Sequence, residues 1–166
     1  MSDIENTSIG YSGEVTISVL HGDKYTKRTL HNAGLPNIFR ILSNALVGRN
    51  SDGDVLTYLD LRYLVTGSGY QTCLVSLLPL SGRYVDKNDS GQWVVKATAA
   101  IPYSSLIRPA SEISTTNFRL YLVSRNKEDL ASLSVDQDDL KSITPGTQAL
   151  VDWTLKIQNL NGSQNE

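Results

Sequence analysis

One segment, residues 36–47, carries the only strong helical periodicity in this 166-residue chain. The apolar residues that recur there at three- and four-residue spacing, and so share one face of a helix, are Leu35, Ile38, Phe39, Leu42, Ala45 and Leu46. Pro36 suits the first turn of this helix, and Gly48 suits a left-handed cap after its last turn. We therefore expect one amphipathic α-helix near the N-terminus, and the rest of the fold needs other elements.

Most of the remaining chain alternates apolar and polar residues, which is the pattern of half-buried β-strands. A hairpin that turns at Gly22 is expected before the helix. Further strands are expected at residues 55–65, 93–101, 118–122 and 151–157, with a nearly continuous apolar strand, covered on both faces, at Cys73–Leu80. About seven or eight strands at hairpin-like spacing predict a mostly β fold. We expect an antiparallel β-sandwich of jelly-roll or immunoglobulin-like form, with a barrel as the alternative.

The chain is expected to form a single domain, because 166 residues can bury one core and no linker composition divides the sequence. The polar, glycine-containing residues 1–13 are expected to be a flexible N-terminal arm. The β-sandwich domain then covers residues 14–158. The polar residues 159–166 are expected to form a loose C-terminal tail.

The charge pattern argues against nucleic-acid and membrane partners. The formal net charge is −2 and the basic residues are scattered, whereas binding to phosphate backbones needs clustered lysine and arginine. No apolar run approaches the roughly 20 residues of a membrane span, and the first residues are polar and acidic, unlike a signal peptide. The one cysteine, Cys73, lies in an apolar run and is expected to be a small buried side chain. These features fit synthesis in a reducing cytoplasm.

Two histidines, His21 and His31, flank the first hairpin and are the first candidates for chemistry. Neither has a further ligand or acid at a spacing that predicts a zinc site or a general base. The sequence also contains no serine-hydrolase, P-loop or zinc-protease motif. We therefore expect no enzyme activity and no catalytic residue.

Two acidic clusters are the remaining candidates for metal binding. The run Asn50-x-Asp52-x-Asp54 resembles the start of a calcium loop, but it lacks the later glycine and glutamate that such a loop needs. The second cluster, residues 136–139, fits a solvated charged loop; its acids are Asp136, Asp138 and Asp139. We expect no metal, no cofactor and no residue dedicated to binding either.

The two tryptophans, Trp93 and Trp153, lie in phase with the apolar positions of their strands, so both are expected in the core. The alternative is a platform on which a sugar ring stacks, and exposure of these side chains distinguishes the two. Four tyrosines could instead serve a protein contact, where tyrosine is enriched; they are Tyr58, Tyr70, Tyr84 and Tyr103. The long connection at residues 102–116 is a second candidate contact.

Two segments at opposite ends of the chain are familiar as a set. The first runs from Gly13-Glu14-Val15-Thr16-Ile17 through His31-Asn32-Ala33-Gly34 to the helix residues 38–46, and the second runs from Pro145-Gly146-Thr147 to residues 151–155. Together they resemble small structural proteins of tailed-bacteriophage virions, including short-tailed gut phages of the crAss-like group. The middle of the chain matches such proteins only in its strand pattern.

This resemblance implies a non-enzymatic subunit repeated around a symmetric particle, synthesised in the host bacterial cytoplasm and located in the virion. A neck or tail ring or adaptor is the expected place. A capsid decoration or head-fibre attachment protein is one alternative, and a receptor- or carbohydrate-binding β-sandwich module is another. The implied partners are copies of the same chain and other virion proteins, namely the portal, tail or capsid proteins, with no nucleic acid and no membrane.

Overall fold

The computed structural model describes residues 9–21, 24–34, 36–48, 54–109, 113 and 117–159, and it is mostly β. The described elements are β1 (Ile9–His21), β2 (Lys24–Gly34), α1 (Pro36–Leu46), β3 (Leu56–Val65), β4 (Gly69–Thr72), β5 (Leu78–Pro79), β6 (Gly82–Lys87), β7 (Trp93–Pro102), the 3-10 helix η1 (Tyr103–Ser105), β8 (Asn117–Ser124), β9 (Asp129–Asp136), α2 (Gln137–Lys141) and β10 (Gln148–Asn159). Every strand pairing that the structure describes is antiparallel.

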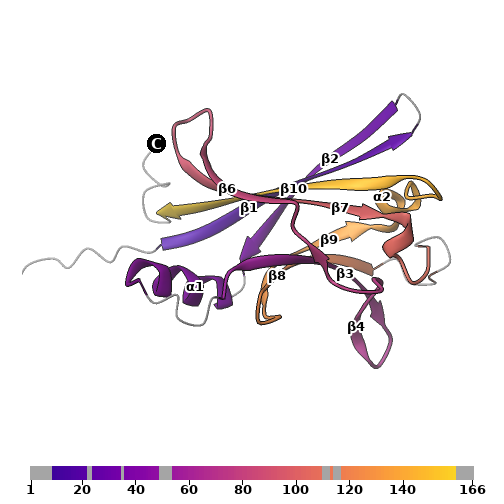
Figure 1. Ribbon diagram of the computed structural model, residues 1–166, viewed down its shortest axis with the longest axis horizontal. Helices are drawn as coiled ribbons and strands as arrows, with labels where there is room; N and C mark the ends of the chain where they lie inside the picture. Colours follow the sequence, from indigo (N-terminus) through magenta and orange to yellow (C-terminus); the bar gives the residue numbers. More distant parts are fainter. Residues whose placement is uncertain are drawn as a thin grey trace, which may run out of the picture.

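The strands follow one hydrogen-bonded path in the order β4-β3-β8-β9-β2-β1-β10-β7-β6, with β5 also paired to β3. The link between β2 and β9 is short, because only Ala33 with Ser132 and Gly34 with Ala131 are in register. The path folds over at this link into two layers (Figure 1). The first layer contains β6, β7, β10, β1 and β2, and the second contains β9, β8, β3, β4 and β5. The result is a sandwich-like arrangement.

A single hydrophobic core fills the space between the layers. The first layer contributes alternate residues of β1, β7 and β10, which lie opposite one another in register, for example Val15 with Trp153 and Trp153 with Ala97. The second layer contributes Leu59 from β3 and Phe118 from β8, both fully buried. The strands predicted at 55–65, 93–101, 118–122 and 151–157 are confirmed. Burial alternates along most of β7 and along β10, whereas three consecutive residues of β3 and five of β8 are buried.

The helix α1 lies at one end of the sandwich, where Ile41 and Leu42 pack against the core (Figure 1). Gly48 follows it with a φ of 69°, which a residue without a Cβ adopts easily. The side chain of Leu46 is 88% exposed, although its spacing predicts a place on the apolar face. A one-turn helix, α2, follows β9 and buries Leu140 against the core.

The segment Cys73–Leu80 is not a central strand, and this prediction is wrong. Cys73 and Leu74 are buried, but Val75 is exposed, and β5 is the only part of the segment that the structure describes as a strand. Its two ends bond to β3, where the Cys73 N–H donates to Leu61 and the Leu80 N–H donates to Thr57. Between them, the Val75 N–H donates to Ser105 in the connection after β7, and the Ile107 N–H donates to Cys73. The apolar run correctly predicted that its first residues are buried, but the expected central strand does not form.

The boundaries of the sheet also differ from the expected domain limits of 14 and 158. Strand β1 begins at Ile9, and β10 extends to Asn159, which lies opposite Ile9 in register. Backbone pairing between the first and last strands carries the sheet into residues 9–13, which the sequence predicted as part of an arm. Residues 1–8 of the expected arm and residues 160–166 of the expected tail lie outside the described residues.

Candidate functional site

The free end of the β6–β7 hairpin exposes apolar side chains on the core-facing side of the first layer. Val85 lies opposite Val95, and Lys87 lies opposite Trp93, so all four share one face of the sheet. Val95 packs against the core, whereas Val85 is 63% and Trp93 is 64% exposed. The hairpin extends beyond the main body of the sandwich (Figure 1). We call Val85, Lys87 and Trp93 the hairpin overhang.

Local contacts hold the hairpin overhang in place. The Lys87 ammonium lies 4.7 Å from the centre of the Trp93 ring, a cation–π distance. At the tip, the Asn88 side chain accepts hydrogen bonds from the backbone N–H groups of Ser90 (3.1 Å) and Gln92 (2.9 Å). At the base, the Arg83 guanidinium donates to the backbone carbonyl of Leu56 in the second layer. The overhang is therefore a preorganised surface rather than a loose loop.

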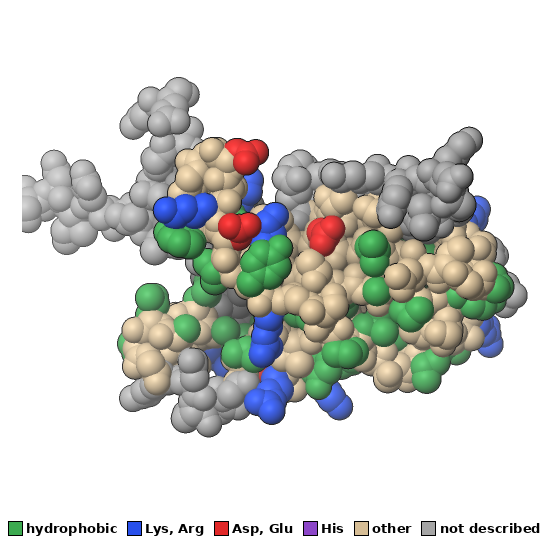
Figure 2. Space-filling model, turned by 45° about the horizontal axis from the view of Figure 1, so that its top comes forward, with side chains coloured by type: hydrophobic (Ala, Val, Ile, Leu, Met, Phe, Trp, Pro, Cys, Tyr) green, Lys and Arg blue, Asp and Glu red, His purple; other side chains and the backbone are tan. Residues whose placement is uncertain are grey.

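Charged side chains of both signs lie beside hydrophobic ones where this hairpin leaves the body (Figure 2). Strand β6 ends the hydrogen-bonded path on this side, and β4 ends it on the other. Edge strands offer unpaired backbone groups to another chain, and natural proteins usually protect them with charge or a bulge. In β6, Arg83, Asp86 and Lys87 provide such charges.

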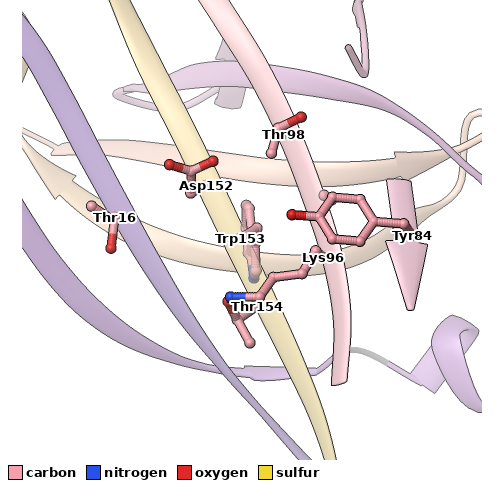
Figure 3. A pocket seen from close by; sticks show the side chains of 8 residues that line it. Thr16, Tyr84, Lys96, Thr98, Asp152, Trp153 and Thr154 are labelled. Carbon is pink, nitrogen blue, oxygen red and sulfur yellow. The ribbon is translucent and has the colours of Figure 1, made fainter. Parts of the chain in front are cut away.

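The opposite face of the same strands is polar and hollowed. A depression of about 350 Å³ crosses β6, β7, β10 and β1 (Figure 3). The side chains of this outer hollow are Thr16, Tyr84, Lys96, Thr98, Asp152 and Thr154. The Tyr84 ring extends from β6 over β7, and the Lys96 ammonium donates to the Thr154 hydroxyl at 2.9 Å.

Gly82 lets β6 approach β7 closely beside the outer hollow. A Cβ at this position would lie 2.8 Å from the Thr98 hydroxyl oxygen, which itself lies 3.1 Å from the Ser81 hydroxyl oxygen. Among the described residues, the Asp152 carboxylate and the Tyr84 hydroxyl have no hydrogen-bond or ion-pair partner. The hollow thus presents unused polar groups on a closely packed edge.

The outer face of the second layer has the opposite character, because the charges around Arg62 are paired with one another. Arg62 donates to buried Asp60 at 2.7 Å and makes a two-bond contact with Asp129 at 2.9 and 2.7 Å. Its guanidinium also lies 3.9 Å from the centre of the Tyr121 ring. Burial opposes the charge of Arg62, but these hydrogen bonds outweigh it and raise its pKa above the ordinary arginine value. We call this group, completed by the Thr72 hydroxyl on Asp60 at 2.7 Å, the Arg62 network.

A second ionic group attaches α1 to the sheet. Arg40 donates to Asp54 at 2.6 Å and to Glu128, which lies in the β8–β9 turn. Burial opposes ionisation of Asp54, but hydrogen bonds from Arg40 and from the backbone N–H of Asn126 outweigh it, so the pKa of Asp54 falls below its ordinary value. Asp54 is therefore a structural anchor. Asn50 and Asp52, the other members of the calcium-like run, lie outside the described residues.

The single cysteine is buried, as expected. Cys73 lies beside a small apolar cavity whose lining includes Leu61, Phe118 and Leu140. Burial, with a smaller contribution from the nearby Asp60 charge, raises the pKa of the Cys73 thiol to about 12. A thiol that stays protonated is a poor nucleophile.

The second acidic cluster, Asp136–Asp139, belongs to the start of α2 rather than to a loop. The backbone N–H of Asp136 donates to the Asp139 carboxylate at 3.3 Å, and Asp138 forms an ion pair with Lys141 at 3.3 Å. Acidic residues in a first turn are stabilised by the helix dipole. In the described part of the chain, no group of three or more metal-binding side chains comes together.

The aromatic predictions had mixed outcomes. Trp153 is 1% exposed, which confirms a core position, but the core prediction for Trp93 is wrong. Tyr84 and Tyr70 are exposed, whereas Tyr58 and Tyr103 are half-buried. The backbones of His21 and His31 lie in β1 and β2, and their side chains are outside the described part of the structure. The outer hollow had no sequence signal beyond Tyr84, because its members come from four strands.

None of the helices in the described segments is long and apolar enough to cross a membrane. Comparisons with protein-family models, with curated proteins and with solved structures found no match.

Proposed function

We propose that this chain is a non-enzymatic structural subunit of a tailed-phage virion, most consistent with a neck or tail ring or adaptor component. In this role it packs against copies of itself and against other virion proteins. The resemblance of its terminal segments to such proteins is the reason for proposing a tailed-phage virion as the particle. The exposed apolar face of the hairpin overhang is the observation that carries the proposal, because it supplies a surface for contacts between subunits.

The overhang has the composition of an energetically important interface. Tryptophan is enriched at the residues that dominate binding energy, and those residues usually lie among apolar and charged neighbours that exclude water. Trp93 is flanked by Val85 and Lys87 and is held on a hairpin whose tip is hydrogen-bonded. A large ring exposed on a preorganised element loses little conformational freedom on binding.

The sheet edges support repetition. A contact between the β6 side of one copy and a different surface of the next is heterologous, and such contacts close into a ring when the rotation between copies closes. Strand β4, at the far end of the path, is exposed along its length and gives the next copy a second open edge. Within this proposal, the pairing of the first strand with the last favours the jelly-roll form of the sandwich over the immunoglobulin-like form.

The test is the mass of the native assembly formed by the full chain, followed by its position in purified particles. Native mass spectrometry of the purified chain is expected to give a closed ring, and particle imaging is expected to place that ring at the neck or tail. A trimer, or a single copy bound to shell protein, would instead support the capsid-decoration or head-fibre alternative. A monomer at every concentration, with no copies in purified particles, would overturn the proposal.

A further inference from the structure

The outer hollow lies on the face opposite the hairpin overhang, so the assembly proposed above leaves it unexplained. Its side chains come from β1, β6, β7 and β10, and they project from one face of the first layer (Figure 3). The depression of about 350 Å³ falls at the lower end of the usual range for small-molecule sites, about 300–1,000 Å³. This size suits one or two small rings.

The register of the strands arranges the polar groups in a row. Asp152 on β10 lies opposite Thr16 on β1 and opposite Thr98 on β7, so a carboxylate has a hydroxyl on each side. Neighbouring strands are about 4.8 Å apart, which is close to the width of a sugar ring. Lys96 uses one of its three N–H donors on Thr154, so two remain for a ligand.

The charges in the hollow point to an uncharged ligand. One ammonium, from Lys96, and one carboxylate, from Asp152, come from adjacent strands and offset each other. A phosphate-rich ligand would need an excess of positive charge that the hollow does not have. A ligand rich in hydroxyl groups matches its mixture of donors and acceptors.

The Tyr84 ring supplies the apolar part of the site. It is half exposed and reaches from the edge strand over β7 (Figure 3). A pyranose ring has one face of C–H groups, and such a face packs well on an aromatic ring while the hydroxyls at its rim form hydrogen bonds. We propose that the outer hollow binds one or two rings of a neutral oligosaccharide, with the sugar face on Tyr84, hydroxyls donating to Asp152 and Lys96 donating to the sugar.

The test uses the full chain and an array of neutral and anionic glycans, followed by calorimetric titration with the best neutral glycan. At least one neutral glycan is expected to bind, and Tyr84→Ala and Asp152→Asn are each expected to weaken binding at least tenfold. Tyr70→Ala and Asp138→Asn are the matched controls, because they remove an exposed tyrosine and an exposed carboxylate elsewhere. Both controls are expected to keep the wild-type affinity.

Thermal unfolding of each variant separates a lost site from a lost fold, and both site positions are surface positions where unfolding temperatures should stay near wild type. Amide shifts of 15N-labelled protein provide a second readout, since the glycan should move resonances of β6, β7 and β10. The proposal is overturned if no neutral glycan binds, if only anionic glycans bind, or if both site variants retain wild-type affinity. The mass of the assembly is measured separately, so this failure leaves the assembly proposal standing.

Discussion

The two tryptophans mark two regions of the same sheet face that meet different surroundings. Trp153, in the middle of β10, is covered by the second layer and is almost completely buried. Trp93, at the start of β7, points to the same side of the sheet but lies beyond the second layer, and about two thirds of it is exposed. A sandwich therefore buries a face only where its two layers overlap. The part that does not overlap remains available for another molecule.

A similar contrast separates the outer faces of the two layers. In the second layer, the Arg62 network satisfies its charges within the chain. In the first layer, the outer hollow leaves Asp152 without a partner among the described residues. Groups that are paired internally contribute to stability, whereas unpaired groups on a shaped surface are available for binding. The predictions below test this division.

The largest expected effect is on stability at Trp153. Trp153→Ala should lower the free energy of unfolding by about 3–5 kcal/mol, because it leaves a large cavity in a close-packed core. Trp153→Phe should cost less, since the indole N–H has no hydrogen-bond partner in the described structure. Urea denaturation followed by circular dichroism measures both. The matched control, Trp93→Ala, should cost about 1 kcal/mol or less, corresponding to one exposed cation–π contact. Equal losses of unfolding free energy at the two positions would contradict the distinction between a covered and an uncovered part of this sheet face.

The next largest effect is expected in the Arg62 network. Arg62→Ala should destabilise the fold by roughly 3 kcal/mol, because it leaves the buried Asp60 carboxylate without its cation. Arg119→Ala is the control on the same layer, since Arg119 donates only to the hydroxyls of Ser132 and Ser134 among described residues. That control should cost about 1 kcal/mol. Urea midpoints measure the difference. Similar losses of stability for the two arginine variants would show that the Arg62 network contributes no more than an ordinary pair of hydrogen bonds.

The local sequence pattern predicts many of the strands, but it does not predict which parts of a sheet face the other layer covers. Alternation predicted the buried faces of β7, β8 and β10, because side chains on successive residues of a strand point to opposite faces. It could not predict that Trp93 is exposed, since this depends on where the second layer ends. It also could not predict the partners of Arg62, because Asp60, Tyr121 and Asp129 come together only after β3, β8 and β9 pair.

The failure at Cys73–Leu80 has a different cause. Both a buried strand and a buried loop favour apolar residues, so composition alone does not distinguish them. Here the backbone of Val75 pairs with Ser105 in the connection after β7, a contact between segments far apart in the sequence. The outer hollow escaped prediction for the same reason, because register between four strands places its side chains together.

The thiol of Cys73 should react slowly in the folded chain. With its pKa raised to about 12, alkylation by iodoacetamide at pH 8 should be at least roughly a hundredfold slower than in urea-unfolded protein, because little thiolate forms. Above pH 9 the unfolded chain loses this proton, while the folded chain keeps it to about pH 12, so the free energy of unfolding should fall across that interval. Cys73→Ala should remove this contribution to the pH dependence of the free energy of unfolding. Rapid alkylation of the native protein would show that the thiol is not buried.

The smallest effect is expected at Asp54 in acid. Its pKa is lowered in the folded chain, so its stabilising contribution is complete above the ordinary value of 3.8 and is lost as the pH falls through the folded-state pKa. Asp54→Asn should be less stable than wild type at pH 7 and should lose less further stability below about pH 4. Thermal unfolding between pH 7 and pH 2 measures this, with Asp138→Asn as an exposed control. An unchanged acid profile would mean that the Arg40–Asp54 pair does not attach α1.

The most direct test of the central claim is sedimentation of the full chain with and without its exposed tryptophan. Trp93→Ser should weaken self-association at least tenfold while the monomer keeps its fold, because a buried interface tryptophan usually contributes about 2 kcal/mol or more. Val75→Ser, which removes an exposed apolar side chain elsewhere, should associate like wild type. If Trp93→Ser associates as strongly as wild type, or if wild type does not associate at all, then the hairpin overhang is not where the subunits meet.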